Sequence, residues 1–172
     1  PDLIVGPQIE EFAGYRARKD GACFVCDAAR SELADGRRVL TSDKHMTAFV
    51  PYAAQYPYDI IVTPTRHVAS LLDLDRDERR SLAHALLHAL TGLDGLFDAP
   101  YHYSLALVQA PTDGVDYGYH MQAHITSLQR GPGLRKHVVG ADIFGRLVNP
   151  SDPDVAAEEI RWAARRQTLG SS

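Results

Sequence analysis

The feature that most constrains the fold is a seven-residue stretch, 119–125, in which apolar and polar side chains alternate. Successive side chains of a β-strand point to opposite faces of a sheet, so this period predicts a half-buried strand. One face would bury the apolar members, which are Tyr119, Met121, Ala123 and Ile125. The opposite face would align the polar members, which are His120, Gln122 and His124. Such a histidine row on a rigid strand can hold a metal ion, a phosphate group or a catalytic base.

The rest of the pattern predicts an α+β domain in which an antiparallel sheet packs against one long helix and a shorter helix ends the domain. Strands are expected at 38–40, 45–51, 56–62, 103–109 and 118–128. The long helix should follow Asp75, a good N-cap residue, and bury a stripe that runs from Leu82 to Leu93. Shorter helices are expected at 27–33 and at about 153–166. Residues 1–22 are expected to be irregular, 23–166 to form the domain, and 167–172 to form a tail.

Bulk properties narrow the class of protein. The 172 residues are enough for one domain with a genuine core. The net charge of -4 argues against nucleic-acid binding through bulk electrostatics. No apolar run approaches the roughly 20 residues that cross a bilayer, and nothing resembles a signal peptide. With only two cysteines, a disulfide framework is not expected, and the predicted location is the cytoplasm.

The two cysteines, Cys23 and Cys26, are separated by two residues. At this spacing both thiolates can bind one tetrahedral zinc ion, provided that two more ligands are found. His67, after the third predicted strand, and His120 are the candidates. Two alternatives stay open: the cysteines could pack as small hydrophobic residues, or they could form a redox pair ahead of a helix. A redox pair would need a preceding strand, which residues 10–22 do not clearly provide.

The histidine row carries the possible catalytic groups. Gln122 cannot attack phosphorus, because its amide nitrogen has no available lone pair, although it can donate and accept hydrogen bonds. His124 could act as a base, but an edge-strand histidine without a catalytic role fits the pattern equally well.

Residues 136–142 combine a cation, a glycine and a carboxylate. Gly140 would allow close backbone approach to a sugar or phosphate, and Asp142 could accept hydrogen bonds from sugar hydroxyls. A strand edge that leads into a turn is an equally good interpretation.

The order and spacing of these blocks resemble the histidine triad superfamily and, within it, the carboxy-terminal half of galactose-1-phosphate uridylyltransferase. The blocks are 23–26 (CFVC), 50–53 (VPYA), 56–58 (YPY), 63–68 (TPTRHV), 103–105 (YSL), 110–111 (AP), the histidine row, 136–142 (KHVVGAD) and 154–161 (DVAAEEIR). The later blocks resemble the transferase half more than a small hydrolase.

The resemblance implies a half-barrel of antiparallel strands. It also implies a zinc ion that is held by Cys23, Cys26, His67 and His120. In the transferase, the nucleophilic histidine lies in the amino-terminal half within an H-P-H-type motif, which this sequence lacks. Gln122 stands at the nucleophile position of the row.

The resemblance further implies a contribution to a hexose-phosphate site at a subunit interface. The matching positions are Lys136, Val139, Gly140 and Asp142. Asp142 replaces the family's Glu, and Ala141 stands where an aromatic residue is common, so hexose choice is left open. Some relatives carry a second, iron-type site in this half. Because Gln122 and Val108 replace two of its histidines, that site is expected to be absent.

These features predict the carboxy-terminal half of a hexose-1-phosphate uridylyltransferase. It would exchange uridylyl between UDP-glucose and galactose 1-phosphate only when a second chain supplies the nucleophile, and it would be inactive alone. A homodimer is the alternative assembly. Two other functions stay open. One is a catalytically silent nucleotide- or sugar-phosphate-binding module with structural zinc, and the other is a histidine-triad hydrolase or phosphorylase that uses His124.

Overall fold

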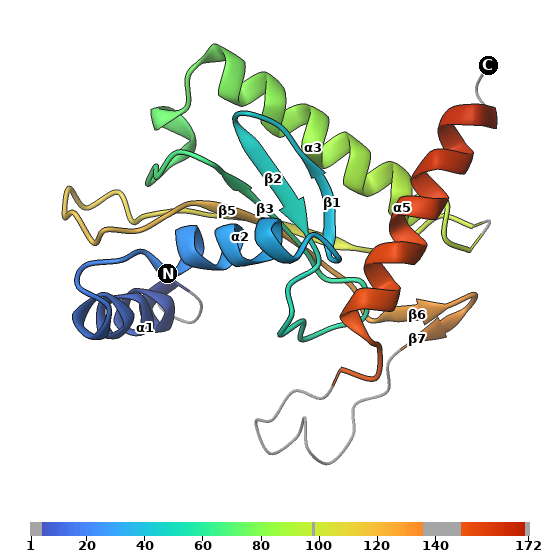
Figure 1. Ribbon diagram of the computed structural model, residues 1–172, viewed down its shortest axis with the longest axis horizontal. Coiled ribbons are helices and arrows are strands. Elements are labelled where there is room, and N and C mark those ends of the chain that lie inside the picture. Colours follow the sequence, from blue (N-terminus) through green and yellow to red (C-terminus); the bar gives the residue numbers. More distant parts are fainter. Residues whose placement is uncertain (1–4, 98, 136–148, 171–172) are drawn as a thin grey trace.

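The computed structural model describes residues 5–97, 99–135 and 149–170 (Figure 1). Its centre is an open five-stranded antiparallel sheet with the strand order β1-β2-β3-β5-β4. The strands are β1 (Val39–Ser42), β2 (Met46–Phe49), β3 (Ile60–Pro64), β4 (Ser104–Val108) and β5 (Gln122–Thr126). A separate two-stranded sheet pairs β6 (Gln129–Gly131) with β7 (Leu134–Arg135). The predicted α+β class and antiparallel sheet are confirmed.

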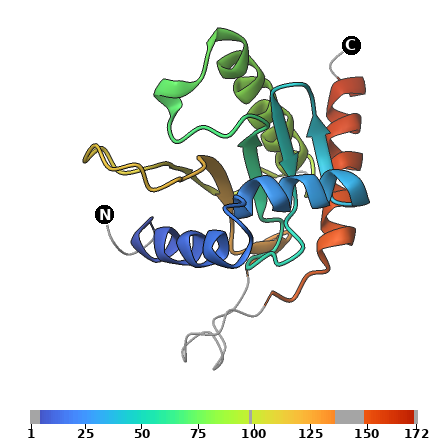
Figure 2. The same cartoon turned by 60° about the vertical axis from the view of Figure 1, so that its left-hand side comes forward.

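Helices cover both faces of the sheet. The described helices are α1 (Val5–Arg18), α2 (Phe24–Asp35), α3 (Arg76–Asp94) and α5 (Pro153–Gly170), with a 3-10 turn, η1 (Leu71–Asp73), before α3. Figure 2 shows α2 in front of the strands and α3 behind them. Strand β2 is buried on both faces for this reason. No helix among the described residues is both long and apolar enough to cross a membrane.

Helix α3 begins where the sequence predicts. The Asp75 carboxylate accepts the backbone N–H groups of Asp77 and Glu78, both at 2.8 Å, and so caps the helix. Leu82 and Leu93 are buried against the sheet, as the stripe predicted. The main apolar cluster unites this helix with α5 and with the apolar face of strands β2, β3 and β5.

The expectation of an irregular segment at 1–22 is wrong for residues 5–18, which form α1. Pro7 lies in the first turn, where proline is tolerated. The helix has no buried residue of its own and is held by tertiary contacts instead. Phe12 packs on Tyr119 with ring centroids 5.5 Å apart, and the Arg16 guanidinium donates to the Tyr117 carbonyl oxygen at 2.6 Å. The expected tail at 167–172 is also wrong for residues 167–170, because α5 continues through Gly170. The domain limits of 23 and 166 stay a prediction.

The predicted strand at 118–128 is shortened to β5, so His120 lies just before the strand. The reason is a different backbone partner: the Met121 N–H donates to the Val68 carbonyl oxygen at 2.8 Å, in the loop after β3. The four apolar members of the 119–125 stretch are nevertheless buried, as the alternation predicted. His120 and Gln122 are also buried, because the polar face is covered as well.

Candidate metal centre

Three separate segments bring the two cysteines and two histidines together. Cys23 is the residue before α2 and Cys26 lies in its first turn, so the turn of the helix places both thiols on one side. His67 comes from the loop after β3, and His120 comes from the residues just before β5. The four ligand atoms lie within 4.8 Å of one another. Of the described residues, these four form the group that could hold a metal ion.

The cluster has the size of a tetrahedral coordination shell. The His120 Nδ1 atom lies 3.3 Å from the Cys26 sulfur and 3.7 Å from the Cys23 sulfur. The His67 Nδ1 atom lies 3.7 Å from the Cys26 sulfur. Zn–S bonds of about 2.3 Å and Zn–N bonds of about 2.0 Å at a tetrahedral angle require S···N separations of roughly 3.6 Å. The three measured separations are close to this value, and the four ligand atoms together spread over at most 4.8 Å, so a zinc ion would draw them only slightly closer.

The surroundings of His120 favour the tautomer in which its Nδ1 atom can bind a metal. Its Nε2 atom lies 3.1 Å from the Pro64 carbonyl oxygen, which can only accept, so Nε2 carries the proton. The lone pair is then on Nδ1, which faces the sulfurs. A backbone carbonyl that orients a histidine ligand in this way is a common outer-shell arrangement in metal sites.

Burial shifts the pKa values of two members of the cluster, His120 and Cys26. It lowers the pKa of His120 to about 4, with a smaller effect from His67 nearby, so the imidazole is neutral at neutral pH. Burial and the adjacent Cys23 raise the pKa of Cys26 to about 12. A bound cation would reverse this preference, because it favours the thiolate. Metal binding at this site would therefore be coupled to proton release.

The rest of the histidine row is separate from the cluster. The His124 Nε2 atom donates to the Gln122 Oε1 atom at 3.1 Å, because an amide oxygen can only accept. Burial lowers the pKa of His124, which keeps this imidazole neutral. The polar face of the stretch thus divides between a candidate metal ligand, His120, and a neutral hydrogen-bonded pair, His124 and Gln122.

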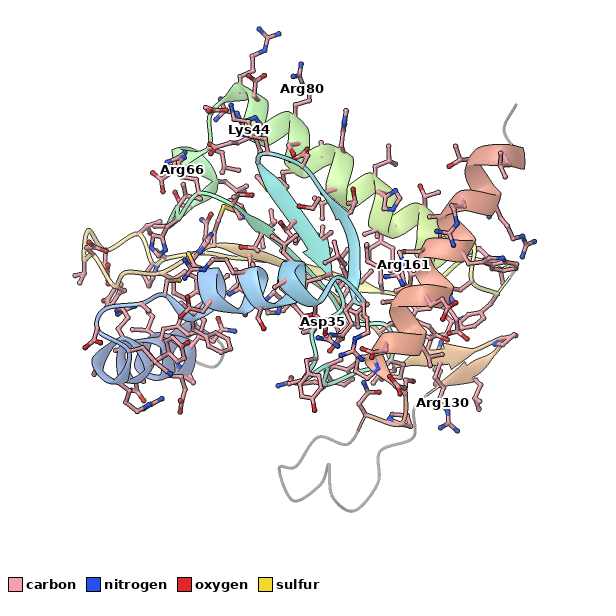
Figure 3. The ribbon with its side chains drawn as sticks, in the orientation of Figure 1. Asp35, Lys44, Arg66, Arg80, Arg130 and Arg161 are labelled. Carbon is pink, nitrogen blue, oxygen red and sulfur yellow. The ribbon has the colours of Figure 1, made fainter. Side chains whose placement is uncertain are left out.

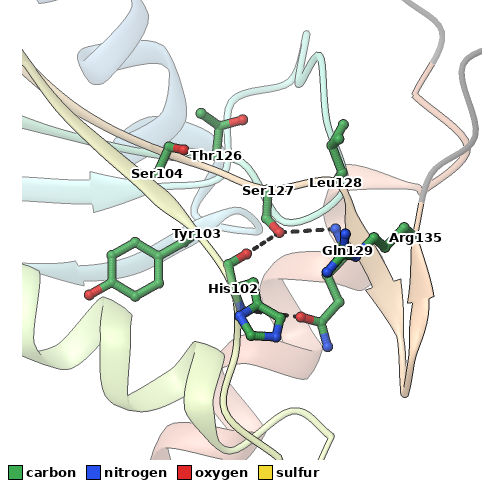
Figure 4. A pocket seen from close by; sticks show the side chains of 8 residues that line it. All are labelled: His102, Tyr103, Ser104, Thr126, Ser127, Leu128, Gln129 and Arg135. Atoms are coloured by element: carbon green, nitrogen blue, oxygen red, sulfur yellow. Dashed lines mark hydrogen bonds between the residues drawn. The ribbon is translucent and has the colours of Figure 1, made fainter.

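The four predicted substrate-binding residues, Lys136, Val139, Gly140 and Asp142, lie outside the described residues. The chain before them lines a pocket of about 310 Å³ (Figure 4). The sequence pattern did not identify the polar residues of this pocket. The Ser127 hydroxyl donates to the His102 carbonyl oxygen, and the His102 backbone N–H donates to the Gln129 side-chain oxygen at 3.1 Å. Arg135 also lines the pocket. Its position next to Lys136, a predicted substrate-binding residue, is the one feature of the sequence that could have pointed to it.

Comparison with known proteins gives consistent matches. The family model described as galactose-1-phosphate uridyl transferase, C-terminal domain, matches residues 8–169. A galactose-1-phosphate uridylyltransferase from Cryptococcus neoformans is 32% identical over 172 residues, which cover 95% of this chain and 45% of that protein. A solved uridylyltransferase structure superposes with a TM-score of 0.85 at 27% identity, over 94% of this chain and 51% of that one. A zinc-bound histidine triad family protein from Mycobacterium smegmatis, with 12% identity and a TM-score of 0.57, shares the fold over 87% of this chain and 97% of its own. The chain spans less than half the length of the curated relatives that it matches.

Proposed function

The chain belongs to the galactose-1-phosphate uridyl transferase C-terminal domain family, and we propose that it is the carboxy-terminal half of a hexose-1-phosphate uridylyltransferase. The observation that carries the proposal is the extent of the match. The solved uridylyltransferase aligns with 94% of this chain, but only with 51% of its own length. The remaining half would come from a second chain or from a further part of the same protein.

The polar face of β5 supports the proposal that the nucleophile comes from the other half of the enzyme. Covalent transfer of a uridylyl group needs a nucleophile, and Gln122 cannot act as one. His124 is neutral and its Nε2 atom is engaged with Gln122, so it is poorly placed to attack phosphorus. The amino-terminal half would therefore supply the histidine. That histidine would take uridylyl from UDP-glucose, release glucose 1-phosphate, and pass the group to galactose 1-phosphate.

The metal in this proposal is zinc with a structural role. Two thiolates and two imidazoles suit zinc, and four protein ligands leave no open position for substrate. Held by Cys23, Cys26, His67 and His120, the ion would tie the start of α2 to the loops at the ends of β3 and β5. Its chemistry would be to cross-link these segments.

The exposed edge of the sheet is the surface that we assign to the amino-terminal half. Strand β4 is one of the two edge strands of the sheet, and each of its residues except Val108 is exposed. Leu105 and Leu107 each leave 43% of their surface in solvent. The strand contains no charge and no proline, the devices that usually protect an edge from pairing with another chain. An apolar edge of this kind is suited to accept a strand of a partner.

The proposed activity is tested with the purified chain and a partner that carries an H-P-H motif. We expect no uridylyl transfer from UDP-glucose to galactose 1-phosphate by this chain alone, and transfer when the partner is added. Activity of the isolated chain that disappears in His124→Ala would overturn the proposal and favour a histidine-triad hydrolase.

The assigned surface is tested by Leu107→Lys, which places a charge on the edge. The matched control is Leu87→Lys, because Leu87 is 66% exposed and belongs to α3 rather than to the sheet edge. We expect the β4 variant to lose partner binding in calorimetry and the α3 variant to retain it. Equal binding by both would refute the edge assignment alone.

The zinc assignment is tested by metal analysis of the purified chain. We expect about one equivalent of zinc, since one four-ligand cluster holds one ion, and loss of it in Cys23→Ser. Less than half an equivalent, unchanged in the variant, would refute the metal site without touching the family assignment.

A further inference from the structure

His67 is the most exposed of the four metal-site residues, and it lies in a loop without regular secondary structure. The backbone around it is nevertheless fixed at two points. The Thr65 N–H donates to the His45 carbonyl oxygen at 2.8 Å, and the Val68 carbonyl oxygen accepts from the Met121 N–H at 2.8 Å. These bonds hold the ends of the loop, while the His67 side chain projects from between them.

The residue before His67 provides a third attachment. Arg66 donates from Nε to the Glu78 Oε1 atom at 2.8 Å and from Nη2 to the Glu78 Oε2 atom at 2.7 Å. The same Nη2 atom donates to the Asp73 carbonyl oxygen at 2.7 Å. Two parallel bonds between a guanidinium and a carboxylate give a defined geometry as well as attraction. Figure 3 shows Arg66 next to the loop that leads into α3.

Glu78 is itself rigidly held. Its side chain is 4% exposed, and Arg66 is the main cause that lowers the pKa of Glu78 to about 2, so the carboxylate stays charged. Its Oε2 atom also accepts the Asp75 N–H at 2.8 Å in the cap of α3. Because α3 packs on β2 and β3, a continuous set of contacts runs from the core through Glu78 and Arg66 to the neighbour of His67.

We propose that Arg66 is a positioning residue of the metal site: its ion pair with Glu78 holds His67 where its Nδ1 atom faces the Cys26 sulfur. The inference rests on the proposed zinc site, and Arg66 itself does not touch the metal. With the pair intact, the loop is ordered when the chain folds. Without the pair, metal binding has to order the His67 loop, and the entropic cost of that ordering lowers the affinity for the metal.

The test is zinc affinity of Arg66→Met, measured by competition with a chromogenic chelator. Methionine keeps the apolar stem and removes the donors, and it leaves the Glu78 cap of α3 intact. We expect the Kd for zinc to rise by about 10-fold, the lower end of the effect of losing a group hydrogen-bonded to a ligand, because Arg66 acts through the backbone next to His67. Arg66→Lys should recover only part of the loss, because an ammonium cannot make both parallel bonds.

The matched control is Arg80→Met. Arg80 pairs with Asp77 in the first turns of the same helix, at 3.1 Å, with both side chains more than half exposed (Figure 3). This exposed ion pair joins two residues of α3 and does not involve the loop that carries His67, so zinc affinity should stay within about twofold, as expected for loss of an exposed pair. Glu78→Gln, which removes the charge but keeps an acceptor for the Asp75 N–H, should weaken zinc binding in the same direction as Arg66→Met.

A double-mutant cycle separates positioning from general stability. In a His67→Ala background there is no His67 to position, so adding Arg66→Met should leave zinc affinity unchanged. An equal loss in both backgrounds, or no loss in the wild-type background, overturns the role of Arg66. Failure of the wild-type chain to bind zinc overturns the metal site as well, so the two failures are distinct.

Discussion

The contact between α3 and α5 depends on Gly92, and Gly92→Ala is expected to destabilise the protein. A Cβ atom at this position would lie 2.7 Å from the Ile160 Cγ2 atom and 2.9 Å from the Ile160 carbonyl oxygen. Non-bonded carbon atoms prefer separations of about 3.5–4.0 Å. Ile160 is fully buried and the second contact is with backbone, so neither can move without shifting α5.

Two opposing effects decide the magnitude. Alanine favours a helix over glycine by about 0.5–1 kcal/mol. Overpacking of a close-packed interface costs about 1–3 kcal/mol. Because one of the two clashes is with backbone, the upper part of that range, about 2–3 kcal/mol, applies. The net expectation is a loss of about 1–2.5 kcal/mol in the free energy of unfolding. For a chain of this size, each kcal/mol lowers Tm by about 2–4 °C, so Tm should fall by roughly 2–10 °C.

Urea unfolding followed by far-UV circular dichroism measures this change, with Gly14→Ala as the matched control. A Cβ atom at Gly14 would meet only the flexible guanidinium of Arg18, at 3.2 Å from Nη1. The control should therefore be neutral or more stable by up to about 1 kcal/mol. If Gly92→Ala is as stable as the wild type, α5 does not pack on α3 as closely as described and the reasoning is refuted.

Three further outcomes follow from the charged and titrating groups. Arg38→Met should lower the free energy of unfolding by about 3–5 kcal/mol, because it removes the partner of the buried Glu32 carboxylate. In the wild type the two groups are 2.8 Å apart. A loss below about 1 kcal/mol in urea unfolding would contradict this expectation. Arg66 holds the pKa of Glu78 near 2, below its ordinary value of 4.5, so this stabilisation is present above pH 4.5 and is lost as pH falls through about 2. Unfolding midpoints from pH 5 to pH 2 should fall more steeply in the wild type than in Arg66→Met, and parallel curves would exclude the pair as the cause. Zinc binding at neutral pH should release the proton of Cys26, whose pKa is raised to about 12. A pH-indicator dye in weak buffer detects the released proton. Zinc binding without acidification of the solution would rule out thiolate ligation.

Local patterns predicted much of the fold. Alternation identified the burial of Tyr119 and Met121, and the Asp75 side chain set the start of α3. These features are readable because strand alternation and helix capping involve residues only a few positions apart. Helix α1 was missed for the opposite reason. Its weak local signal, interrupted by Gly6 and Pro7, is outweighed by contacts with residues about 100 positions away.

The residues of the candidate metal site were predicted from the sequence, but the way the fold positions them was not. The Cys23-x-x-Cys26 spacing and the family resemblance named all four members of the cluster. They did not reveal that His120 lies before its strand, or that Pro64 selects its tautomer. The pairing of Arg66 with Glu78 was equally hidden, since nothing in the sequence distinguishes this pair from other oppositely charged residues.

The sequence by itself therefore determined the residue types that the chemistry needs: a thiol pair at chelating spacing, histidines that can join it, and a glutamine at the centre of the histidine row, which cannot act as a nucleophile. Only the tertiary structure decided how those residues are used. It brought His67 and His120 to the thiols, left β4 as an exposed edge, and linked the His67 loop to α3 through Arg66. The physical reason is that side-chain period and capping are local properties of the chain. Convergence of distant segments depends instead on which buried surfaces and backbone hydrogen bonds are satisfied together.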